Sequence, residues 1–154
     1  MKRVRIFGMV VIGVALALAF ARPMEASSQV PPTSQMAEEL ETAARALHHR
    51  ADRWSEAARL YVVAADLRQS EDPEARKDLF KAASLYYATG RTVEAVAALE
   101  SAGTRTLAGG DAAEARRMFD RAAWVARDAG LVAHERRLAG RADRVGDALA
   151  SHRS

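Results

Sequence analysis

The sequence predicts an all-α protein, on three observations. From about Met36 onward the chain is rich in alanine, leucine, arginine and glutamate, which are strong helix formers. Runs of β-branched residues are few, and the strict alternation of apolar and polar residues that is typical of strands is absent. Apolar residues recur at helical spacing between residues that start or stop helices. We therefore expect helices packed on helices and no sheet.

The N-terminal segment, residues 1–21, is typical of a secretory signal peptide. Three cations within residues 2–5 precede an uncharged, mainly apolar run of sixteen residues, 6–21. A helix over that run would be about 24 Å long, which is shorter than the roughly 30 Å hydrocarbon core of a bilayer. Small residues at Ala19 and Ala21 suit cleavage after Ala21, and cleavage after Ala19 is a second option. The alternative is an uncleaved anchor that holds the domain at the inner membrane.

Composition then excludes several classes of protein. Residues 1–21 hold three of the 23 lysines and arginines and none of the 20 acids, so the remaining chain has balanced charge. A nucleic-acid partner is therefore not predicted, because it would need a basic stripe. The chain has no cysteine, which excludes lipoprotein processing and disulfides, so stability must come from packing.

The rest of the chain divides into a linker, one domain and a tail. Residues 22–35 hold three of the four prolines together with Ser, Thr and Gln, and predict a flexible spacer. Residues 36–150 suffice for one domain with a sizeable core, and residues 151–154 form the tail. The expected helices are 36–50, 54–69, 74–89, 92–108, 111–129 and 131–149.

Helix starts, stops and apolar faces support this division. Asp72-Pro73 and Asp111 are expected to start helices, and Gly90 and Gly109-Gly110 to stop them. Short connections predict antiparallel neighbours. The expected apolar faces are Trp54, Ala58, Tyr61 and Ala65; Leu79, Ala82, Ala83 and Tyr86; Val93, Val96, Leu99 and Ala102; and Ala115, Phe119, Ala122 and Ala126. The alanines in them favour close packing of neighbouring helices.

An internal repeat carries the strongest indication of a fold. The stretch 79–102, LFKAASLYYATGRTVEAVAALESA, resembles a tetratricopeptide repeat (TPR), with a small pair at Ala82-Ala83, a turn at Gly90 and Glu94-Ala95 opening the second helix. Weaker copies lie upstream and downstream at offsets of about 40 residues, which is longer than the usual 34 of the family. Arg45 and Glu135 depart from its small positions. The resemblance implies an α-solenoid of about three antiparallel helical hairpins.

The resemblance also implies a concave groove lined by the first helix of each hairpin. The expected groove residues are Lys77, Phe80, Ser84 and Tyr87 in the middle copy, Arg117, Asp120, Trp124 and Arg127 downstream, and Thr42, His49 and Arg50 upstream. Aromatic rings and arginines suit an extended peptide or an amphipathic helix. Alternatively, Phe80 and Trp124 pack against neighbouring helices, and the arginines make solvated surface pairs. The carboxylate clamp of TPR proteins uses asparagines, and this chain has none.

Catalysis is not predicted, and neither is a metal or a cofactor. The histidines do not form an HExxH motif, and the sequence has no Gly-x-Ser-x-Gly turn and no glycine-rich phosphate loop. The acidic pairs Glu38-Glu39 and Glu71-Asp72 lie near expected helix starts, where they interact favourably with the helix dipole.

Two functions follow from these patterns. The first is a non-enzymatic protein-interaction module, an adaptor or scaffold with a protein or peptide partner, exported to the periplasm of a Gram-negative bacterium. The alternative is an assembly protein that forms a homodimer through its last helix, where Val132, Leu138, Val145 and Leu149 form an apolar stripe that no further hairpin covers. A membrane association is expected only if the signal peptide stays uncleaved.

Overall fold

The structure, a computed structural model, describes residues 32–69 and 72–151, which are all-helical and contain no strand. The predicted signal peptide, most of the predicted linker and residues 152–154 lie outside the described residues. The helices are α1 (Pro32–His48), α2 (Trp54–Leu67), α3 (Pro73–Ala88), α4 (Thr92–Ala108), α5 (Ala112–Asp128) and α6 (Val132–Ser151), and a 3-10 turn (Ala51–Arg53) precedes α2.

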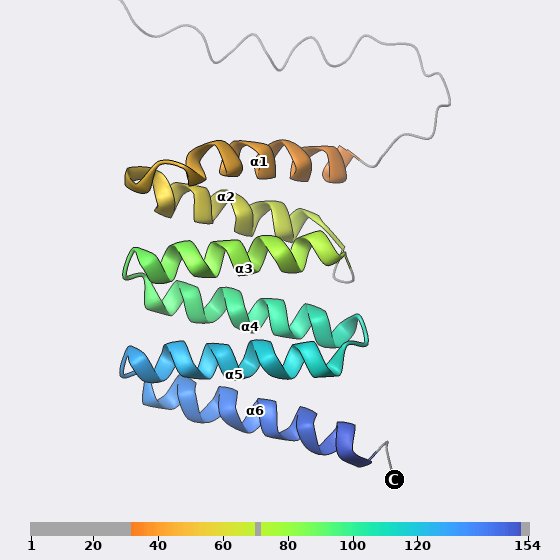
Figure 1. The fold of residues 1–154 in the computed structure, drawn as a ribbon. Coiled ribbons are helices and arrows are strands. Elements are labelled where there is room, and N and C mark those ends of the chain that lie inside the picture. Colours follow the sequence, from red (N-terminus) through yellow and green to blue (C-terminus); the bar gives the residue numbers. More distant parts are fainter. Residues whose placement is uncertain (1–31, 70–71, 152–154) are drawn as a thin grey trace, which may run out of the picture.

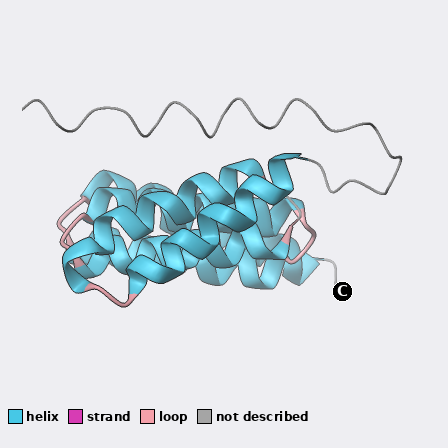
Figure 2. Cartoon of the chain, turned by 90° about the horizontal axis from the view of Figure 1, so that it is seen from above, coloured by secondary structure: helices cyan, strands magenta, loops and turns pink. Residues whose placement is uncertain are grey.

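The helices are stacked in the order of the chain (Figure 1), and each packs chiefly against the helices that precede and follow it. Successive helices run in opposite directions, so their connections gather along two opposite sides of the stack, at the ends of the helices (Figure 2). As a result α1, α3 and α5 start on one of these sides, and α2, α4 and α6 start on the other.

The predicted starts and stops explain these boundaries. Asp72 accepts a hydrogen bond from the backbone N–H of Glu74 at 2.8 Å, and Asp111 accepts one from Glu114 at 2.9 Å, so both aspartates are N-caps. Gly90, Gly110 and Gly130 follow α3, α4 and α5 with φ values of 73°, 85° and 69°. Only glycine adopts this left-handed conformation without strain, and here it allows each chain reversal within a few residues.

Two expectations were wrong in detail. The first helix begins at Pro32 rather than at residue 36, so residues 32–35 of the predicted spacer are helical. Proline is well tolerated in the first turn because no intrahelical partner exists there for its missing N–H. Val93 and Val132 were placed on apolar faces but are 53% and 51% exposed. Both lie at the start of a helix, where the Cβ points back toward the connection and away from the neighbouring helix.

The core runs through the stack as a series of close helix contacts. Alanines occupy most buried positions, and Tyr61, Leu79, Val96, Phe119 and Leu138 are its largest fully buried apolar side chains. Small residues let the helix backbones approach, and the few large ones fill the remaining space. The other expected face residues are buried or packed against the core.

Between residues 32 and 69 and between residues 72 and 151, no helix is both long enough and apolar enough to cross a bilayer.

Candidate binding groove between α3 and α5

The surface between α3 and α5 carries a pocket of about 650 Å³. It opens between the N-terminal halves of these two helices, which are the first helices of the second and third hairpins. Its lining residues are Pro73, Arg76, Lys77, Phe80 and Lys81 from α3, Thr106 from α4, and Asp111, Glu114, Arg117, Met118 and Arg121 from α5 and its N-cap. We call this site the α3–α5 pocket.

The α3–α5 pocket combines an apolar wall with excess positive charge. Phe80 and Met118 are half-buried and pack against the core. Five lining residues are lysines or arginines and two are acids. The starts of α3 and α5 at Pro73 and Asp111 add the positive ends of two helix dipoles. The arrangement can therefore take an anionic group next to an apolar one.

An exposed aromatic pair lies farther along the same two helices. The rings of Tyr87 on α3 and Trp124 on α5 are 5.8 Å apart between centroids, at an interplanar angle of 52°. Trp124 is 54% exposed, so its ring is not packed beneath a neighbouring helix. The Tyr87 hydroxyl donates a 2.7 Å hydrogen bond to Asp128, which raises the pKa of Tyr87 and fixes the orientation of its ring.

The structure brings some of the predicted groove residues together. Lys77, Phe80 and Arg117 line the α3–α5 pocket, and Tyr87 and Trp124 are in ring contact. Ser84 is exposed on α3 between Phe80 and Tyr87 in the sequence, and its hydroxyl donates to the Phe80 carbonyl at 3.0 Å.

The other predicted residues make local contacts outside the pocket. Arg127 pairs with Glu135 at 2.6 Å, and Asp120 lies 3.9 Å from Arg116. Arg50 pairs with Asp52 at 3.3 Å, and the His49 ring lies 6.3 Å from that of His48. The hydroxyl of Thr42 donates to the carbonyl of its own helix at Glu38. The upstream hairpin therefore contributes none of the residues that line the pocket.

Sequence reasoning missed Arg121, a cation that lines the pocket and contacts the ring of Phe80. Its guanidinium group lies 4.7 Å from the centroid of the Phe80 ring. The two residues are 41 positions apart, close to the repeat offset of about 40. Pairing Phe80 with the cations near that offset on α5 was the signal in the sequence that pointed to this contact.

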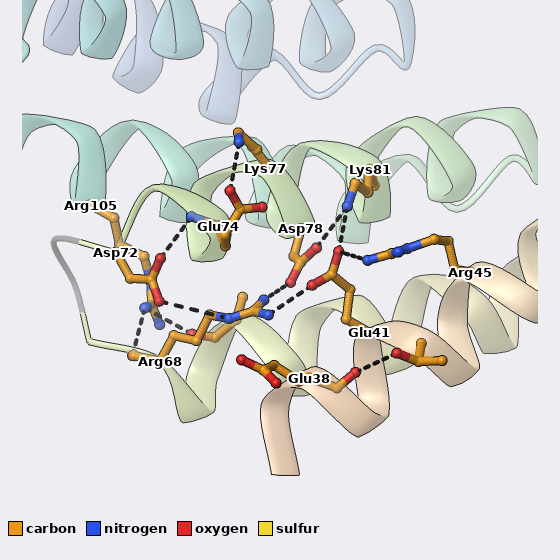
Figure 3. A network of polar contacts seen from close by, with 12 residues as sticks. Glu38, Glu41, Arg45, Arg68, Asp72, Glu74, Lys77, Asp78, Lys81 and Arg105 are labelled. Atoms are coloured by element: carbon orange, nitrogen blue, oxygen red, sulfur yellow. Dashed lines mark hydrogen bonds and ion pairs between the residues drawn. The ribbon is translucent and has the colours of Figure 1, made fainter. Parts of the chain in front are cut away.

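A buried ion-pair network beside the pocket was also missed. Its members are Glu41 and Arg45 on α1, Arg68 at the end of α2, and Asp78 and Lys81 on α3 (Figure 3). Arg68 donates to both Asp78 and Glu41, the latter at 2.8 Å, and its side chain is only 6% exposed. Lys81 reaches Glu41 at 3.0 Å and Asp78 at 3.1 Å.

The pKa values of the two acids in the network are shifted in opposite directions. Burial alone would raise the pKa of Glu41, but hydrogen bonds from Arg68, Lys81 and Arg45 overcome it and lower the pKa from 4.5 to about 2. For fully buried Asp78, burial raises the pKa more than its hydrogen bond from Lys81 lowers it. Because Lys81 also lines the α3–α5 pocket, the network holds in place one wall of the groove.

The spacing of two acids along the sequence indicates this network. Asp78 lies at helical spacing between Ala75 and Ala82, and Glu41 lies between Ala37 and Ala44; all of these residues are buried. An acid at a position of an apolar face indicates a buried partner of opposite charge.

Comparisons of the chain with protein-family models, with curated proteins and with solved structures found no match.

Proposed function

We propose that this protein is a non-enzymatic interaction module that binds a segment of a partner protein along the groove between α3 and α5. The observation that carries the proposal is that a pocket and an exposed aromatic pair lie along the same two helices. The α3–α5 pocket occupies one end of the two helices, and the exposed pair of Tyr87 and Trp124 follows on the same helices. Rigid aromatic side chains bind partners well because they bury a large area and lose little conformational entropy.

The fold supports this proposal through its repeated units. The turn glycines Gly90, Gly110 and Gly130 recur every 20 residues, so each hairpin spans about 40 residues, and each helix packs chiefly on its sequence neighbours. We propose on these grounds that the stack is a TPR-like solenoid. Stacks of this kind offer an extended surface built from equivalent helices.

Photo-crosslinking tests the groove in the cells that produce the protein. Ser84 and Thr104 are a matched pair, because both are exposed and both donate to the carbonyl four residues earlier, Ser84 on α3 and Thr104 on α4. A photoreactive residue at position 84 should form an adduct with a partner, and one at position 104 should not. The substitution Trp124→Ala should then remove the adduct. Equal adducts at both positions, or none at either, would count against the groove.

We also propose that the protein is exported and acts in the periplasm. The support is the N-terminal sequence, with its cationic start and short apolar run over residues 1–21. N-terminal sequencing of the protein purified from the producing cells should find Arg22 as the first residue. An unprocessed N-terminus in the membrane fraction would favour the anchored form instead.

Self-association through α6 has less support. Leu138 is 0% and Val145 is 8% exposed, because α6 packs this stripe onto α5, and Leu149 packs against the core. Little of the stripe therefore remains for a second copy. Light scattering of the purified protein should give a monomer; a stable dimer that Leu149→Asp dissociates would favour the alternative.

A further inference from the structure

Two arginines of the α3–α5 pocket are not neutralised. Among the five cations, Lys77 pairs with Glu74 at 2.6 Å, Arg117 pairs with Glu114, and Lys81 belongs to the ion-pair network. Within residues 32–69 and 72–151, neither Arg76 nor Arg121 has an acidic partner. Arg76 is half-buried, where water screens an ion pair less, and Arg121 is exposed, so its guanidinium group is accessible to a partner's carboxylate.

Arg121 is well oriented to receive such a group. Its guanidinium lies over the Phe80 ring, with Cζ 4.7 Å from the ring centroid. A guanidinium group stacks on an aromatic ring through its face, whereas its N–H groups point outward in its plane and donate to a carboxylate there. Phe80 can therefore orient Arg121 without competing for the N–H groups that would bind an acid.

The opposite end of the groove has a different character. At the pair of Tyr87 and Trp124, Asp128 accepts a hydrogen bond from the Tyr87 hydroxyl, and Arg127 is already paired with Glu135. This end offers apolar ring surface and a negative charge, so it disfavours a second acidic side chain. The groove is thus cationic at one end and aromatic at the other.

We infer that the partner segment inserts an acidic side chain into the α3–α5 pocket against Arg121 and places an apolar side chain on Tyr87 and Trp124. This inference rests on the proposed function and specifies its partner. Phe80 and Tyr87 are seven residues apart on one helix, which corresponds to about 10 Å along its axis. An extended chain covers that distance in about three residues. The segment should therefore carry its acidic and apolar residues about three positions apart, in either chain direction.

A display library of random linear peptides tests this inference. The bait is the protein expressed from its full-length sequence and purified, and the peptides are about ten residues long, which is enough to span the groove. We expect bound peptides to be enriched in Asp or Glu about three residues from an aromatic or large aliphatic residue. Affinities of the best peptides are then measured by titration calorimetry at two salt concentrations, because an ion pair weakens with added salt.

A pair of substitutions assigns the acidic contact. Replacing the peptide's acid by its amide should weaken binding about ten- to a hundred-fold on the wild-type protein, as expected for a charge-assisted hydrogen bond. The same change should have little effect on the variant Arg121→Gln. The control Arg144→Gln alters an exposed arginine of α6 that lies outside the pocket. On this variant, the acidic peptide and its amide should differ in affinity as much as they do on the wild-type protein.

The outcomes separate this inference from the proposed function. Peptides without acidic enrichment that still need Trp124 would overturn the inference and leave the groove as a binding site. The inference would also be overturned if replacing the peptide's acid by its amide lowered the affinity equally for the wild-type protein and for Arg121→Gln. If no peptide is enriched, or if Tyr87→Ala and Trp124→Ala leave binding unchanged, the groove itself is not the binding site.

Discussion

Gly103 leaves space in α4 that Phe119 of α5 fills. A Cβ atom at position 103 would lie 2.7 Å from Cε1 of the Phe119 ring, closer than two carbon atoms approach in proteins. Phe119 is fully buried, so its ring cannot make room by moving into solvent. The close packing of α4 on α5 therefore depends on a residue with no side chain.

We predict that Gly103→Ala lowers the free energy of unfolding by about 1–3 kcal/mol, because overpacking outweighs the better helix propensity of alanine. Gly140→Ala is the matched control in α6. Its Cβ would meet the terminal nitrogen of Arg144 at 3.7 Å, which is an ordinary contact, so stability should rise by up to about 1 kcal/mol. Urea denaturation followed by circular dichroism measures both values, and changes of the same sign would contradict the packing argument.

The ends of the helices depend on a few polar side chains. Asp111 satisfies a backbone N–H at the start of α5, and no other side chain in the described chain binds that group. We predict that Asp111→Ala costs about 1 kcal/mol of stability. Asp143→Ala changes an exposed aspartate in the interior of α6 and should alter stability by less than about 0.5 kcal/mol. Thermal unfolding of the two variants in parallel tests the difference; an equal loss would mean that Asp111 is not acting as a cap.

The ion-pair network joins α1 to α3 across the end of α2. Removing the charge of Glu41 leaves Arg68 with fewer acceptors in a buried position. We predict that Glu41→Gln costs about 1–3 kcal/mol at neutral pH. The control is Glu56→Gln, which removes an exposed partner of Arg53 and should cost less than about 1 kcal/mol. Denaturant titration of both variants at neutral pH provides the test, and equal costs would show that the buried network contributes no more than a surface pair.

Low pH should also weaken the link between α1 and α3. The pKa of Glu41 is about 2 in the folded protein, whereas that of an unperturbed glutamate is 4.5. Ionised Glu41 therefore contributes its full stabilisation above about pH 4.5, and this stabilisation is lost as the pH falls toward 2. The raised pKa of Asp78 acts in the opposite direction, because protonating that buried acid favours the folded state. We therefore predict that stability falls less steeply with acid in Glu41→Gln than in the wild type. Parallel slopes in denaturant titrations over this range would contradict the assignment to Glu41.

The elements were predictable from the sequence because their signals are local. Asp111 and the glycine turns act within a few residues, so helix type and most boundaries could be derived. The ring contact of Tyr87 with Trp124 and the position of Arg121 over Phe80 were not predictable. They depend on how far one helix is shifted along another, and the repeat offset alone aligned Tyr87 with Arg127 instead. Likewise, Arg68 could be assigned to its acids only once α1, α2 and α3 had been placed together.

At the scale of the whole molecule, stability is a sum over neighbouring helices. Within residues 32–69 and 72–151, each helix packs chiefly on the helix before and the helix after it, so α1 and α6 each have one neighbouring helix where the others have two. The buried residues of α6 include Leu138 and Val145, whereas those of α1 are two alanines and Glu41. Leu47 of α1 packs against the core but is only partly buried, so no large apolar side chain within residues 33–48 is fully buried. The ion-pair network provides an additional link from α1 to α3.

We predict from this imbalance that α1 opens before the rest of the stack. In native-state hydrogen exchange at neutral pH, the amides of α1 should be less protected than those of α6, and those of α4 at the centre should be protected most. Between about pH 4.5 and about pH 2, protonation of Glu41 should lower the protection factors of α1 more than those of α6. Glu41→Gln should produce the same selective loss at neutral pH. Uniform loss of protection over all six helices would instead mean that the stack unfolds as one cooperative unit. The network would then stabilise the whole stack and not only the link between α1 and α3.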